Sequence, residues 1–176
     1  MMIRQEQLNP FLKGFLLYLA SLMLVQFAYE LLPLPAVGLV SAVCEAVFQH
    51  MKGTFYAYLL VSAIEIAVVR QRSQGLIMSR LLAAVLFPWL IFLAWYIAPA
   101  VYGPMPTVLL EIIYANVVMI MAIAACIVME RDLARLSYSR GFGGVIVASF
   151  LVLILLFTTF SFRTPWADLF TVPPGW

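Results

Sequence analysis

Five long runs of apolar residues dominate this sequence and limit the folds that are open to it. About 20 apolar residues in a helix cross a hydrocarbon core of about 30 Å. No run alternates polar with apolar residues over the length of a strand, so we expect helices and not a β-barrel. The sequence therefore predicts an all-α bundle, one domain over residues 1–176. Its five transmembrane helices are expected at residues 11–32, 53–69, 81–98, 107–129 and 143–162.

The overall composition excludes several other classes of protein. Hydrophobic residues make up 65% of the chain and charged residues 10%, whereas soluble domains average about half and about a quarter. This excludes a water-soluble monomer and a disordered chain. Ten Lys and Arg residues against eight Asp and Glu form no basic patch, so we expect no nucleic-acid partner. Cys44 and Cys126 provide neither a disulfide framework nor a zinc ribbon. We expect a multi-pass protein of the plasma membrane whose first partner is the lipid bilayer.

The distribution of basic residues predicts the orientation in that membrane. With five spans, the N-terminus, the second loop and the fourth loop lie on one side. Cytoplasmic loops carry an excess of Lys and Arg, so this side is expected to be cytoplasmic and the C-terminus outside. The predicted inner side has Arg4, Lys13, Arg70, Arg72, Arg80, Arg131, Arg135 and Arg140, and the outer side has Lys52 and Arg163.

Polar residues inside apolar runs are the candidates for function, because a carboxylate at mid-bilayer costs about 2.5–3.5 kcal/mol. Four of them map to the outer half and form a candidate polar outer site: Glu30, Glu45, His50 and Glu111. Gln26, Lys52, Glu65 and Asn116 are secondary candidates. Glu65 lies near the inner end of its span, where a salt bridge to the inner arginines is expected.

A metal site is one interpretation of the outer residues. The imidazole of His50 with the carboxylates of Glu45 and Glu111 would suit Zn²⁺ or Mn²⁺, and the same groups could act as acid and base. The chain has no pair of histidines at helical spacing, however, and no cofactor follows from the sequence. The other interpretation is that each group contacts headgroup water or a neighbouring helix.

The segment Ser41-Ala-Val-Cys-Glu-Ala-Val-Phe-Gln-His-Met-Lys52 resembles the signature of a bacterial family of small polytopic membrane proteins of unknown function. That family has Ser-Pro-Val-Asn-Glu-Ser-Val-Trp-Glu-His-Leu-Lys at this point. Phe27-Ala-Tyr-Glu30 and Ile64-Glu65 also match its pattern. The resemblance implies that Glu30, Glu45, His50, Lys52 and Glu65 matter, and it implies no particular activity. Here Gln26, Cys44 and Gln49 replace the family's His, Asn and Glu.

Three functions are compatible with the sequence, which does not decide whether the chain is an enzyme. The first is a non-enzymatic accessory or binding subunit that packs against other membrane chains or against copies of itself. The second is an outer-leaflet metal-dependent hydrolase or transferase that uses His50, Glu45 and Glu111. The third is a small oligomeric transporter, in which Glu65 and Asn116 could couple to protons.

The geometry around His50 can also be predicted. Residues 41–69 contain no proline, so we expect one largely continuous helix over this range. Glu45 and His50 are five residues apart and would not share a face of that helix. His50 should therefore face the bundle interior and contact Glu30 or Glu111, and not Glu45.

Overall fold

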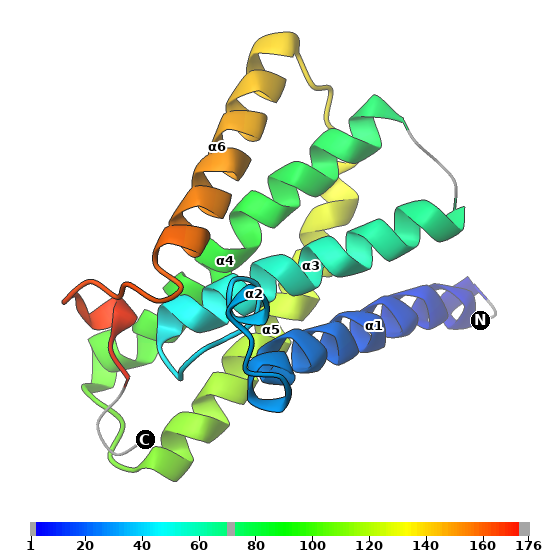
Figure 1. Ribbon diagram of the computed structural model, residues 1–176. Helices are drawn as coiled ribbons and strands as arrows, with labels where there is room; N and C mark the ends of the chain where they lie inside the picture. Colours follow the sequence, from blue (N-terminus) through cyan, green and yellow to red (C-terminus); the bar gives the residue numbers. More distant parts are fainter. Residues whose placement is uncertain (1–2, 70–72, 173–176) are drawn as a thin grey trace.

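A computed structural model describes residues 3–69 and 73–172, with the side chains of 11–68 and 73–172. Within these ranges the chain is helical and has no strand (Figure 1). Five of the helices are long and apolar enough to cross a membrane, as the sequence predicts. Arg70, Arg72 and the side chain of Arg4 lie outside this description. The elements are α1 (Ile3–Leu31), α2 (Pro35–Gly38), α3 (Val47–Val69), α4 (Gln74–Tyr102), α5 (Val108–Leu133), α6 (Arg140–Thr159) and the 3-10 helix η1 (Asp168–Phe170).

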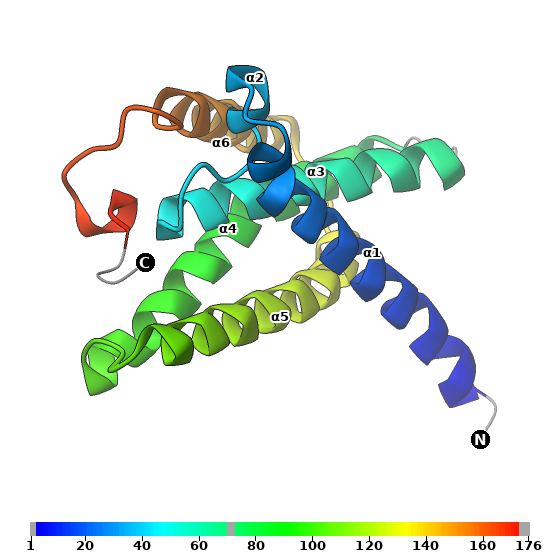
Figure 2. The same ribbon diagram turned by 60° about the horizontal axis from the view of Figure 1, so that its bottom comes forward.

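The helices α3 and α4 form the centre of the bundle. α1 packs on α3 and α5, while α4 packs on α3, α5 and α6. In Figure 2, α1 and α5 cross and then diverge toward the end of α1 and the start of α5. In the span of α3 half of the residues are buried, but in α6 only 17% are. The polar groups of α3 are therefore the best placed to meet partners from other helices.

Three of the spans begin at a hydroxyl side chain that caps the helix. Ser73, Thr107 and Ser139 each accept a hydrogen bond, at 3.2 Å, from the backbone N–H three residues later. Such caps satisfy one of the free N–H groups in the first turn. They explain why α4, α5 and α6 begin where they do.

The expected continuous helix over residues 41–69 is wrong in its first turns. α3 begins at Val47, and residues 41–46 form bends. Side-chain hydrogen bonds hold this stretch instead: Gln49 Oε1 accepts from the N–H of Val43 at 3.4 Å, and Ser41 Oγ accepts from the N–H of Tyr29 on α1 at 2.9 Å. From Val47 onward α3 is continuous, including at Gly53.

The third span also extends beyond the predicted boundary, because α4 continues through Pro99 to Tyr102. A proline within a helix has no N–H for the carbonyl four residues earlier, here that of Trp95. The hydroxyl of Tyr114 on α5 lies 3.2 Å from Trp95 O and closer to Ala94 O, so its one hydrogen is shared between the two carbonyls. This neighbouring hydroxyl explains why the helix tolerates Pro99. The helix ends at Gly103, whose φ of 82° is one that favours glycine.

Aromatic rings fix the segment after α6 to the end of the bundle where α3 begins. The ring of Phe48 lies 4.5 Å from that of Phe170 and 5.3 Å from that of Phe157, between centroids. Phe160 packs on Phe170 at 5.3 Å. The segment after α6 therefore covers the start of α3, as the red 3-10 helix in Figure 1 shows.

Candidate functional site

His50 is the centre of a polar network at the end of the bundle where α3 begins. Its Nδ1 lies 3.1 Å from Nε2 of Gln26 on α1, and its Nε2 lies 3.2 Å from Oε2 of Glu45. The imidazole also stacks near Trp95 of α4, with centroids 6.4 Å apart. The side chains of His50 and Glu45 are 15% and 32% exposed. The imidazole of His50 is therefore contacted from α1, from the segment before α3 and from α4.

The network has a defined hydrogen-bond order when His50 is neutral. Its Nε2–H donates to Glu45, and its Nδ1 accepts from the amide of Gln26. Oε1 of Gln26 is then buried and has no hydrogen-bond partner in the described part of the chain. Protonation makes both ring nitrogens donors, so the Gln26 amide must rotate and present Oε1 to Nδ1. The hydrogen bond with His50 lowers the pKa of the Glu45 carboxyl, which keeps Glu45 ionised.

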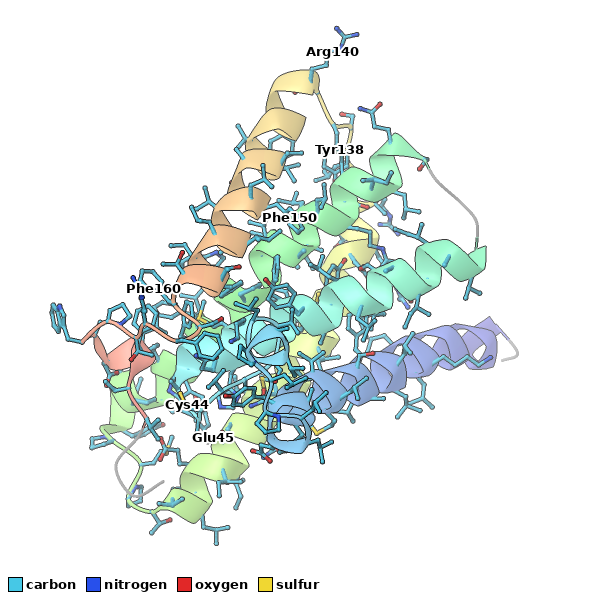
Figure 3. All side chains as sticks on the ribbon, in the orientation of Figure 1. Cys44, Glu45, Tyr138, Arg140, Phe150 and Phe160 are labelled. Carbon is cyan, nitrogen blue, oxygen red and sulfur yellow. The ribbon has the colours of Figure 1, made fainter. Side chains whose placement is uncertain are left out.

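A cleft opens beside this network, between the diverging halves of α1 and α5. Its volume is about 220 Å³. Gln26, Glu45, His50 and Asn116 contribute its polar groups. The rest of its wall is apolar and consists of Leu22, Met23, Phe27, Ile112, Ala115 and Met119. We call this space the α1–α5 cleft; Glu45, one of its lining residues, is labelled in Figure 3.

The expected partners of His50 need correction. His50 does face the bundle, but it contacts Glu45 and Gln26. The contact with Glu30 or Glu111 that the sequence predicts is absent among the described contacts of His50. The cause is the non-helical backbone over residues 41–46, which lets Glu45 fold back onto the imidazole. Glu30 is exposed at the end of α1, and Glu111 lies in the first turn of α5. Neither lines the cleft.

No group of three His, Cys, Asp or Glu residues suited to a metal ion occurs among the described residues. The proposed set of His50, Glu45 and Glu111 thus includes one close pair, His50 and Glu45. This pair can hold and transfer a proton, and it presents one carboxylate to the cleft.

Lys52 belongs to a different group, although it is only two residues from His50. Two residues turn a helix by about 200°, so the two side chains leave α3 on opposite faces. Lys52 is 0% exposed, and its Nζ donates to Gly38 O at 2.8 Å and to Ser161 Oγ at 3.1 Å. Gln49 adds a 3.4 Å hydrogen bond to Ser161 O. These contacts join α2 and the end of α6 to α3.

A second charged network lies toward the other end of the bundle. Arg80 of α4 forms ion pairs with Glu65 of α3, at 2.6 Å, and with Glu130 of α5. Glu130 also accepts from the hydroxyls of Tyr58, at 2.5 Å, and of Tyr18, at 3.5 Å. We call these residues the inner network, after the side of the membrane on which the sequence predicts them. It joins four helices through one guanidinium and two carboxylates.

A stripe of polar side chains on α3 runs from one network to the other. His50, Thr54, Tyr58, Ser62 and Glu65 are spaced by three or four residues and therefore share one face of the helix. The three central residues are at most 5% exposed, and Ser62 Oγ has no hydrogen-bond partner among the described residues.

Sequence reasoning missed several members of these networks. Glu130, Tyr58, Trp95 and Ser161 were not among its candidates. Arg80 and Glu130 lie just outside the apolar runs. Charged residues are common at such positions, so their presence there does not indicate a functional site. The four-residue spacing along α3 is the signal that could have identified Tyr58.

Comparisons of the chain with protein-family models, with curated proteins and with solved structures give no match. The class of the protein therefore follows from its fold and site alone. Its five apolar helices are those of a multi-pass membrane protein, with a polar network and a cleft among them.

Proposed function

We propose that this chain is a non-enzymatic binding subunit of the plasma membrane, with its N-terminus in the cytoplasm and its C-terminus outside. The α1–α5 cleft would hold a membrane-soluble ligand. The observation that carries this proposal is the composition of the cleft: apolar walls around a small number of convergent polar groups, which is the usual composition of a ligand site. The positive-inside distribution of Lys and Arg supports the orientation.

The energetics of the cleft support binding. An apolar group that leaves the lipid gains packing contacts with Leu22, Met23 and Met119, and methionine adapts to ligands of different shape. Glu45 and Asn116 both line the cleft and are the groups we propose for the polar head of the ligand. Asn116 donates to Ile112 O of its own helix at 2.8 Å, and its carbonyl oxygen remains an acceptor.

The role as a subunit rests on α6. This helix packs on α4 and leaves most of its residues facing outward. Other membrane chains or a second copy of this chain are the partners we propose for it.

Purification in a mild detergent, followed by native mass spectrometry, tests the proposal. We expect a co-purified small molecule, a stoichiometric partner or a homo-oligomer. Ala115→Trp fills the cleft and should remove the small molecule, whereas Ala125→Trp, on an exposed face of the same helix, should retain it. A monomer without ligand in every preparation would contradict the proposal.

Transport is a second candidate, and the polar stripe on α3 favours it. A proton at His50 could reach the inner network through Tyr58 if water enters between the hydroxyls. Proton flux into liposomes should then fall in Tyr58→Phe and in Glu65→Gln. Unchanged flux in both variants would argue against transport.

A further inference from the structure

The charges around the α1–α5 cleft select a type of ligand. Among the described residues that line it, Glu45 is the one with a full charge at neutral pH. The cationic side chain nearest in sequence, Lys52, is directed to the opposite face of α3, where it bonds Gly38 and Ser161. Glu45, hydrogen-bonded to His50 at 3.2 Å, is therefore the one carboxylate among mainly apolar walls.

We propose that the α1–α5 cleft binds lipophilic cations, meaning apolar or aromatic molecules that carry one delocalised or quaternary positive charge. This inference rests on the proposed function and names the ligand class for the same cleft. Glu45 supplies the counter-charge, and the low dielectric of the surroundings makes the attraction stronger than in water. Phe27 offers an aromatic face to the cation, and Met23 and Met119 offer polarisable sulfur.

The groups that face His50 from the surrounding elements are Gln26 from α1, Glu45 from the preceding segment and Trp95 from α4. Asn116 is the polar residue that α5 contributes to the cleft. Glu30 and Glu111, at the ends of α1 and α5, do not line it.

Equilibrium binding to the whole chain in phosphatidylcholine nanodiscs tests the proposal. The probe is tetraphenylphosphonium, and the controls are tetraphenylborate, which has the same shape and the opposite charge, and neutral triphenylphosphine oxide. We expect Glu45→Gln to weaken tetraphenylphosphonium binding about tenfold or more. Glu30→Gln removes an exposed carboxylate outside the cleft and should leave the affinity unchanged.

The thermal unfolding of each variant shows whether it is folded. A folded Glu45→Gln variant with full affinity would overturn the cation inference, and so would equal binding of the three probes.

The two proposals can fail separately. If the neutral probe binds and Ala115→Trp abolishes its binding, but Glu45→Gln has no effect on any probe, the binding function stands and the cation selectivity is wrong. If no probe, charged or neutral, binds in a manner that Ala115→Trp reduces, both proposals fail.

Discussion

The Nζ atom of Lys52 lies 2.8 Å from the carbonyl oxygen of Gly38, inside the protein and fully shielded. Two residues earlier, His50 contacts Gln26 and Glu45 on the opposite face of α3. The side chains of residues 41–52 therefore form two separate sets of contacts. One set joins α2 and the end of α6 to α3, and the other forms the polar end of the α1–α5 cleft.

The contact between Lys52 and Gly38 predicts a loss of stability in Lys52→Met. Gly38 O and Ser161 Oγ would lose a buried donor, which costs about 1–3 kcal/mol. Denaturation in detergent micelles measures the change in the free energy of unfolding. Lys13→Met, at an exposed position on α1, should change it by less than about 0.5 kcal/mol. Equal or greater stability of Lys52→Met would contradict the assigned role.

The inner network predicts a larger loss in Arg80→Met. Glu65 and Glu130 would then face each other without a cation, and breaking such a buried pair costs about 3–5 kcal/mol. The same denaturation experiment applies. Arg135→Met is the matched control, because Arg135 is 80% exposed and pairs with Asp132 at 3.5 Å, so its loss should cost less than about 1 kcal/mol. Adding Glu65→Gln to Arg80→Met should restore part of the stability, and a double variant that is no more stable would exclude this explanation.

The lowered pKa of Glu45 predicts how stability depends on pH. The carboxyl has an ordinary pKa of 4.5 when unfolded, and the hydrogen bond with His50 lowers this pKa in the folded protein. The stabilisation is therefore complete above pH 4.5 and is lost as the pH falls through the folded pKa. Melting temperatures measured from neutral to acidic pH should decline less steeply in Glu45→Gln, while Glu30→Gln retains the steeper decline. Identical profiles for Glu45→Gln and the unmodified chain would refute the linkage.

The proposed orientation predicts which loops are accessible from outside the cell. In a chain with both native cysteines replaced, Thr164→Cys should react with a membrane-impermeant maleimide in intact cells. Ser73→Cys and Ser137→Cys, in the second and fourth loops, should react only after the cells are opened. Labelling of Ser137→Cys in intact cells would reverse the orientation.

Some features of the candidate site could be predicted from the sequence, and others could not. The interior location of His50 follows from its place in a segment rich in apolar residues. Its pairing with Glu45 does not follow, because helical spacing separates the two, and the non-helical bends before Val47 bring them together. The resemblance to a membrane-protein family remains a prediction.

The sequence by itself determined the helical class and the five spans, because length and apolar composition are local properties and a bilayer requires every backbone group to be bonded within its own helix. Only the tertiary structure decided which polar groups meet. The pairing of Glu65 with Arg80 depends on the rotation of α3 against α4, and the cleft depends on the angle at which α1 and α5 diverge. These rotations and angles follow from the packing of many side chains at once, and no local pattern in the chain encodes them.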